Sequence, residues 1–157
     1  MNRDVNILLV EDDPGNAVLV KKSLILAGFE NDIQHFENGQ DILDFLFDHH
    51  NAPNLIMSKY IILLDINMPR INGFDVLKKI KGNETLRTIP VIMLTTSDCD
   101  EDVNRCYEHG CNGYIVKPPD LSDVIEKLGG FLQVDCVPSV HLKQDCLQDI
   151  LIQEVLK

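Results

Sequence analysis

The chain has 157 residues and a net charge of -11, which favours one domain with a short appendage and argues against binding to nucleic-acid phosphates. Its five cysteines are odd in number and show no C-x-x-C spacing, which argues against a zinc site or a disulfide framework and favours reduced thiols. The N-terminus is too short and too charged for a secretion signal, and no apolar run approaches the ~18 residues of a membrane span, so we expect a cytoplasmic protein without membrane contact.

The chain begins with a short aliphatic run and a longer amphipathic segment. Residues 5–10, VNILLV, lack polar alternation and predict a strand buried on both faces. A helix is expected over residues 14–29, with Pro14 at its start and Gly28 at its stop. Its inward stripe is expected to consist of Val18, Leu19, Leu24 and Ile25.

A second strand and a second helix are predicted next, at residues 32–36 and 39–49. Apolar side chains recur about one turn apart in this helix, at Ile42, Leu43, Leu46 and Phe47. Residues 49–59 predict a loop, and the third strand is expected over residues 60–64.

The same alternation continues to the end of the predicted domain. It gives a helix over residues 73–82, a strand over 89–94, a helix over 100–110, a strand over 113–116 and a helix over 120–132. A strand and a helix thus follow each other five times. This pattern predicts a parallel sheet with helices on both faces, joined by right-handed crossovers.

Turn-forming pairs at residues 129–130 and 137–138 mark the expected end of the domain. We therefore expect a domain over residues 1–133 and a tail over 134–157, helical over 139–157. The apolar stripe of the tail either packs on its own domain or mediates a dimer or partner contact.

Polar residues follow the predicted strands at the edge where open parallel sheets bind ligands. They are Glu11, Asp12 and Asp13 after the first strand, Asp65 and Asn67 after the third, Thr95 and Thr96 after the fourth, and Lys117 after the fifth. If the first and third strands are neighbours, their carboxylates converge, and a divalent cation offsets the repulsion. All-oxygen ligands favour Mg2+, Mn2+ or Ca2+ over Zn2+, and a few protein ligands with retained waters suit Mg2+.

Asp65 ends an aliphatic strand and needs a partner, because an unpaired buried carboxylate is costly. Carboxylates form aspartyl phosphates as nucleophiles, and phosphoryl transfer depends mainly on positioning and charge neutralisation. We therefore expect Asp65 to attack phosphorus in line. Glu11 and Asp12 would hold the metal against one phosphoryl oxygen. Lys117 would neutralise a second oxygen, and the Thr95 hydroxyl would donate to the third.

Four motifs, VEDDP, LLDINMP, MLTTS and GYIVKPP, occur in this order and together resemble the receiver domain of two-component response regulators. The resemblance covers about residues 6–132. It implies a doubly wound, flavodoxin-like sheet of five parallel strands in the order 2-1-3-4-5, with helices on both faces. The tail would add an extra C-terminal helix.

The resemblance also implies a role for each residue at the strand ends. Asp65 would be the phosphoacceptor. Mg2+ would be held by Glu11, Asp12 and Asp65, together with the backbone carbonyl of Asn67. Lys117 would be the cation that senses the phosphoryl group.

Further implied features concern switching and phosphoryl lifetime. Thr95 and Tyr114 would form the switch pair, and a cis peptide would precede Pro118.

The chain departs from the family pattern at two positions. Asp13 adds a third acid, which we expect outside the metal shell. Thr96 stands where the family more often has alanine or glycine, and we expect its larger side chain to hinder the hydrolytic water.

Within the family, the LTTS run, the long loop before the third strand and the short tail look like single-domain regulators paired with phytochrome-type histidine kinases. This finer resemblance implies a sensor histidine kinase as partner. We expect no direct nucleic-acid partner, because the chain is acidic and its tail is too short for a DNA-binding module. The fourth helix, fifth strand and fifth helix would form the output face and, with the tail, a homodimer contact. The chain would catalyse only its own phosphorylation and dephosphorylation.

Other functions compete with this interpretation. A phosphorelay shuttle would pass the phosphoryl group on to another histidine. A phosphatase of the haloacid dehalogenase type needs an acid two residues after the nucleophile, where this chain has Asn67. A flavin or nucleotide binder would need a Gly-rich loop after the first strand, where acids repel phosphate. A scaffold that is never phosphorylated would not need so complete a pocket.

Overall fold

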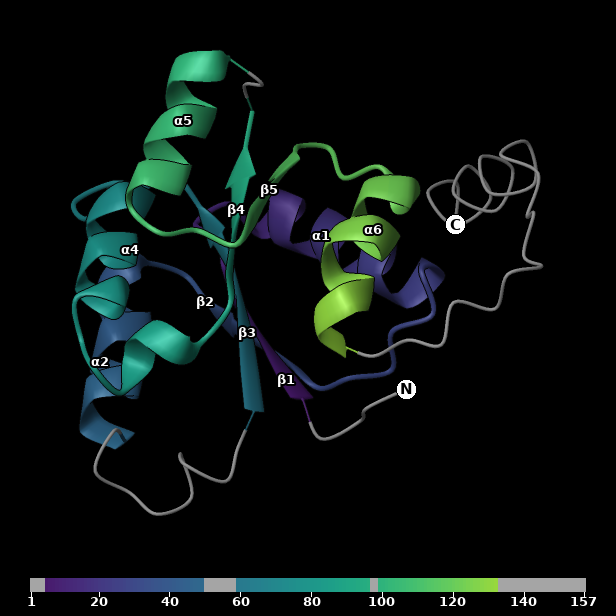
Figure 1. Cartoon of the computed structure of the whole chain (residues 1–157). Helices are drawn as coiled ribbons and strands as arrows, with labels where there is room; N and C mark the ends of the chain where they lie inside the picture. The colour runs from purple at the N-terminus through teal and green to yellow at the C-terminus, as the bar shows by residue number, and fades with distance from the viewer. Residues whose placement is uncertain (1–4, 50–58, 97–98, 133–157) are drawn as a thin grey trace.

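The computed structural model describes residues 5–49, 59–96 and 99–132 (Figure 1). The strands are β1 (Val5–Val10), β2 (Ile33–Phe36), β3 (Lys59–Asp65), β4 (Val91–Thr95) and β5 (Gly113–Val116). The α-helices are α1 (Pro14–Leu26), α2 (Gly39–His49), α4 (Gly73–Lys81), α5 (Asp100–Glu108) and α6 (Leu121–Leu132), and η1 (Leu86–Thr88) is a 3-10 helix. Most of the predicted loop over 49–59, and the predicted tail over 134–157, lie outside the described residues.

The five strands form one parallel sheet in the order β2-β1-β3-β4-β5, so the predicted doubly wound order is confirmed. β1 and β3 pair along their lengths, from Val5 opposite Lys59 to Val10 opposite Leu64. At the end of β3, Asp65 lies opposite Leu94 of β4. The carboxyl ends of β1, β3 and β4 therefore meet at one edge of the sheet, which is the edge that the polar residues follow.

Helices cover both faces of the sheet, with α2, α4 and α5 on one side and α1 and α6 on the other (Figure 1). Alternate residues of each strand face the two cores: Ile62 and Leu64 pack in the first core, and Ile61 and Leu63 in the second. This explains why β3 is aliphatic without polar alternation. No helix in the described part of the chain has the length and apolar character needed to cross a membrane.

The inward face of α1 differs from the prediction. Ala17, Val20 and Leu24 are buried, whereas three of the four residues in the expected stripe are exposed: Val18 at 49%, Leu19 at 44% and Ile25 at 65%. The expectation was therefore wrong for all but Leu24. Apolar residues occur all around this helix, so their spacing cannot identify the buried face, which is set by packing against the sheet and α6.

Glycines end two helices with the same backbone motif. After α1, Gly28 has a φ of 90°, Gly28 N–H donates to Ile25 O at 3.0 Å, and Phe29 N–H donates to Leu24 O at 3.1 Å. Gly110, with a φ of 92°, ends α5 in the same way. This paired bonding satisfies the last helical carbonyls and requires a left-handed residue, which explains the glycines.

The short helix η1 was not predicted. The Asn83 side chain begins it, because Asn83 Oδ1 accepts from Thr85 N at 2.9 Å and from Leu86 N at 3.0 Å. Leu86 is fully buried in the core beneath α4. The turn therefore anchors the connection between α4 and β4 through one apolar side chain.

Candidate functional site

Main-chain hydrogen bonds bring the polar strand ends to one edge of the sheet. Glu11 directly follows β1, whose last residue lies opposite Leu64, the neighbour of Asp65. The backbone N–H of Lys117 donates to Thr95 O at 2.6 Å, which fixes the start of the loop after β5. Glu11, Asp65, Thr95 and Lys117 therefore come from four different elements to the same edge.

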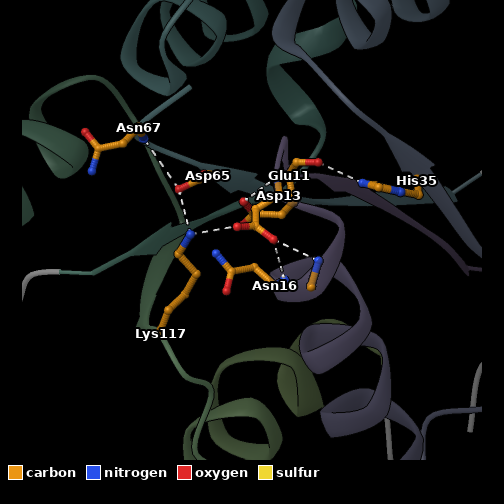
Figure 2. A network of polar contacts seen from close by, with 8 residues as sticks. Glu11, Asp13, Asn16, His35, Asp65, Asn67 and Lys117 are labelled. Carbon is orange, nitrogen blue, oxygen red and sulfur yellow. Dashed lines mark hydrogen bonds and ion pairs between the residues drawn. The ribbon is translucent and has the colours of Figure 1, made fainter. Parts of the chain in front are cut away.

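The ammonium group of Lys117 joins two of these residues (Figure 2). Lys117 Nζ lies 2.9 Å from Glu11 Oε2 and 3.1 Å from Asp65 Oδ1. The side chains are 9% exposed for Lys117, 1% for Glu11 and 3% for Asp65. The peptide between Lys117 and Pro118 is cis, as the resemblance implies. Two carboxylates thus share one cation, and all three side chains are largely shielded from solvent, which strengthens their charge interactions.

The electrostatics of this group are unfavourable for the Asp65 anion. Burial, followed by repulsion from Glu11, raises the pKa of Asp65 to about 6, although Lys117 acts in the opposite direction. Burial alone would lower the pKa of Lys117, but its contacts with Glu11 and Asp65 together raise it. One ammonium therefore does not neutralise the negative charge of both carboxylates, and a second positive charge would stabilise the site.

Three acids have the arrangement of a cation site. One carboxylate oxygen from each of Glu11, Asp12 and Asp65 lies within 4.8 Å of the others. Glu11 and Asp65 are buried and Asp12 is exposed, so the cluster opens to solvent on one side. Asn67 N–H donates to Asp65 Oδ1 at 3.4 Å while its side chain points away (Figure 2), so only its main chain faces this site. Such an all-oxygen set fits a hard divalent cation.

Asp13 has a different role from the two acids before it. Its Oδ1 accepts from Gly15 N at 2.8 Å and from Asn16 N at 3.2 Å, so it is the N-cap of α1. Its own N–H donates to Glu11 Oε1 at 3.2 Å. Asp13 therefore fixes the turn that carries the acids and does not belong to the carboxylate cluster.

The residues expected to act as a switch lie on β4 and β5. Thr95 is buried and Thr96 is exposed. The half-buried Tyr114 ring stands edge-on to the Tyr107 ring, with centroids 6.3 Å apart, and Lys127 Nζ lies 5.4 Å from its centroid. Sequence reasoning missed these two neighbours of Tyr114, because α5 and α6 bring them together only in the folded chain.

Two further residues were missed. His35 Nε2 lies 2.8 Å from the backbone oxygen of Glu11. Gly73 lies against the end of β3, and a Cβ there would collide with the backbone oxygen of Asp65. The Asn-Gly pair at 72–73 gave only a weak signal, because glycine is costly in a helix interior but ordinary directly after an N-cap such as Asn72.

Comparison with known proteins identifies the family. The model of the response regulator receiver domain matches residues 7–129. The probable methanogenesis regulatory protein FilR2 of Methanothrix harundinacea is 37% identical over 118 residues, which are 75% of each chain. The response regulator Rcp1 of Synechocystis is 35% identical over 129 residues, which are 79% of this chain and 84% of Rcp1.

Solved structures agree in fold and in sequence. The bacteriophytochrome response regulator AtBRR superposes with a TM-score of 0.68 at 34% identity, covering 82% of this chain and 92% of AtBRR. The Mn2+-bound form of Rcp1 superposes with a TM-score of 0.64 at 32% identity, covering 82% of this chain and 95% of that structure. With the family model matched over residues 7–129 and the polar residues that follow β1, β3, β4 and β5 at one edge of the sheet, this chain belongs to the response regulator receiver family, whose members are signalling switches.

Proposed function

We propose that this protein is a response regulator that accepts a phosphoryl group on Asp65 from a partner histidine kinase, in the presence of Mg2+. The observation that carries the proposal is the placement of the buried Asp65 carboxylate between the Lys117 ammonium and two further acids. A structural carboxylate would not need this excess of negative charge around it.

The chemistry assigned to Asp65 is an in-line displacement at phosphorus. A carboxylate oxygen forms the new O–P bond while the bond between phosphorus and the donor's histidine nitrogen breaks, and the donor retains that electron pair. The pKa of Asp65 near 6 leaves most of the carboxyl ionised at neutral pH. Asp65 is therefore present largely as the nucleophilic anion.

Other residues of the chain bind and orient the transferred group. Glu11, Asp12 and Asp65, with the backbone carbonyl of Asn67, would hold Mg2+, which supplies positive charge to the phosphoryl oxygens when bound. Lys117 would move its ammonium from the carboxylates toward a phosphoryl oxygen. The Thr95 hydroxyl would donate to another phosphoryl oxygen. This bond would favour an active state that the protein already samples, and it would thereby couple the site to Tyr114.

Support for a divalent ion comes from two directions. The donor atoms are carboxylate oxygens, the ligand type that Mg2+ and Mn2+ prefer. The similar protein Rcp1 was solved in a Mn2+-bound form. We infer Mg2+ for this chain because a three-acid cluster open on one side leaves positions for water and a phosphoryl oxygen, as Mg2+ usually requires.

The partner is proposed from the relatives and the surface. AtBRR is a bacteriophytochrome response regulator, so a sensor kinase of the phytochrome type is the partner we propose. The charge of -11 disfavours direct contact with nucleic acid. We assign the output face to α5, β5 and α6 around Tyr114, with the tail over 134–157 as a further contact in a homodimer. The sensor kinase and the second copy of the chain would both meet the protein in the cytoplasm.

Phosphorylation can be tested with a small donor. Incubation with acetyl phosphate and Mg2+ should add one phosphoryl group, measured by intact mass. Asp65→Asn and EDTA should each abolish the gain, whereas Asp48→Asn, which alters an exposed acid of α2, should leave it unchanged. Continuous turnover of the donor would instead indicate a phosphatase, and a gain that survives in Asp65→Asn would overturn the assignment of the phosphoacceptor.

A further inference from the structure

The imidazole ring of His35 contacts the main chain of the acidic site. His35 lies on the edge strand β2, and its Nε2 is 2.8 Å from the backbone oxygen of Glu11 (Figure 2). A carbonyl oxygen can only accept a hydrogen bond, so Nε2 carries the proton and donates. A side chain from the neighbouring strand therefore bonds directly to the residue that begins the acidic pair.

This bond replaces a missing backbone bond of the sheet. The ladder between β1 and β2 runs to Val10 opposite Phe36, and Glu11 N–H then donates to Phe36 O at 3.1 Å. In this register the next donor to the Glu11 carbonyl would be Asn38 N–H. The chain has already left the sheet there, because Asn38 Oδ1 accepts from Asp41 N at 2.8 Å in the first turn of α2. His35 supplies the donor that the shortened strand cannot.

The peptide that His35 bonds to also determines where the acids lie. The Glu11 carbonyl belongs to the peptide unit that carries the amide of Asp12, so fixing one fixes the other. Glu11 is held by Lys117 at Oε2 and by the Asp13 amide at Oε1. Asp12 is exposed, so the main chain on either side of it decides where its carboxylate lies.

We propose that His35 is a positioning residue for the metal-binding acids. By donating to the Glu11 carbonyl, it holds the Glu11–Asp12 peptide in the orientation that lets both carboxylates reach one ion together with Asp65. This inference rests on the proposed function, because the ion concerned is the one proposed there. It assigns His35 no contact with the ion or the phosphoryl group.

The test measures Mg2+ binding to three variants of β2 by titration calorimetry, with Mg2+ as the only ligand. His35→Leu removes the donor and replaces the ring with an apolar side chain that a strand tolerates. His35→Gln places an amide N–H near the position of Nε2. Gln34→Leu is the matched control, because Gln34 is the exposed neighbour on the same strand. We expect His35→Leu to weaken Mg2+ binding about three- to tenfold, and His35→Gln to recover most of that loss. Gln34→Leu should bind as the wild type does.

Phosphorylation by acetyl phosphate gives a second readout that a merely structural role would not produce. His35→Leu should need more Mg2+ for its half-maximal rate, yet reach the wild-type rate at saturating Mg2+. Unchanged Mg2+ affinity in His35→Leu, an equal loss in His35→Gln, or a lower rate at saturating Mg2+ would each overturn the proposal. If no protein gains a phosphoryl group, the proposed function fails, while the Mg2+ titration still decides the role of His35.

Discussion

Two half-buried lysines lie at opposite ends of the strands β4 and β5, and they are used in different ways. Lys117, after β5, contacts two carboxylates, and its pKa is raised. Lys81, at the end of α4, donates to three neutral oxygens: Ile89 O at 2.8 Å, Asn112 Oδ1 at 3.0 Å and Arg87 O at 3.1 Å. Burial lowers the pKa of Lys81. A lysine side chain thus serves as an exchangeable counterion at one end of these strands and as a fixed hydrogen-bond donor at the other.

The difference shows how the sheet separates stability from function. Lys81 and Asn112 fasten the start of β4, since Asn112 Oδ1 also accepts from Val91 N at 2.9 Å. The oxygens around Lys81 are satisfied and no acid competes for it among the contacts of its ammonium. At the carboxyl edge, Glu11 and Asp65 compete for Lys117, so an added cation or phosphoryl group can redistribute these contacts.

The largest expected effect is that of Lys117→Met in EDTA at pH 7. The change leaves two buried carboxylates without their cation, and we expect a loss of about 3 kcal/mol in unfolding free energy. Saturating Mg2+ should restore most of it, because the ion neutralises the same acids. Urea unfolding with and without Mg2+ measures both, and Lys78→Met on the exposed face of α4 should stay within about 0.5 kcal/mol of wild type. An equal loss in both buffers would mean that the acids do not hold the ion.

Asp65→Asn should change stability in the opposite direction. The folded pKa near 6 exceeds the ordinary 3.8, so ionised Asp65 destabilises the metal-free protein at pH 7. The amide should therefore add about 2 kcal/mol in EDTA. Between pH 6 and 4 the native carboxyl takes up its proton before the unfolded one does, so the cost to the wild type disappears as pH falls. The advantage of the variant should shrink over this range, and an advantage independent of pH would contradict the assigned cause.

Lys81→Met tests the other edge. The variant removes a donor from three oxygens, and we expect a loss of about 1 to 2 kcal/mol that is the same with and without Mg2+. Phosphorylation by acetyl phosphate should be unaffected under conditions where the variant is folded. Lys79→Met, two residues away and exposed, is the matched control. Magnesium-dependent stability in Lys81→Met would remove the distinction between the two lysines.

The two lysines also show how far the sequence could predict the molecule. The position of Lys117 followed from its place after an aliphatic strand, because parallel strands bring their ends to one edge regardless of helix packing. Lys81 gave no such signal. It stands in the lysine-rich last turn of α4 with Lys78 and Lys79, and only the folded chain places Arg87, Ile89 and Asn112 around one of the three.

The remaining errors have similar causes. The elements were predicted because short aliphatic runs alternate along the chain with longer amphipathic segments. In α1, however, apolar residues occur all around the helix, so its buried face depended on contacts with the sheet and α6. Asp13 is no such error, because it was expected outside the metal shell; the backbone turn supplies the reason, since its side chain caps α1. His35 was missed because its partner is a main-chain oxygen on another strand, and main-chain oxygens leave no pattern in a sequence.

The smallest expected effect concerns Thr96, which lies at the carboxyl edge but is exposed. Its side chain should obstruct the water that hydrolyses the aspartyl phosphate, so Thr96→Ala should speed phosphoryl loss about three- to tenfold, equivalent to about 1 kcal/mol in the barrier. The protein can be phosphorylated with acetyl phosphate, freed of donor, and followed by intact mass.

The matched control for Thr96 is Thr88→Ala, which alters an exposed threonine of η1 at the opposite edge. Thr88 precedes β4 and so lies at the end of the sheet opposite the polar strand ends. Its variant should therefore lose the phosphoryl group at the wild-type rate. Unfolding free energies of both variants should stay within about 0.5 kcal/mol of wild type. Equal decay in Thr96→Ala and wild type would show that the Thr96 side chain does not obstruct the hydrolytic water and contributes nothing to the phosphoryl lifetime.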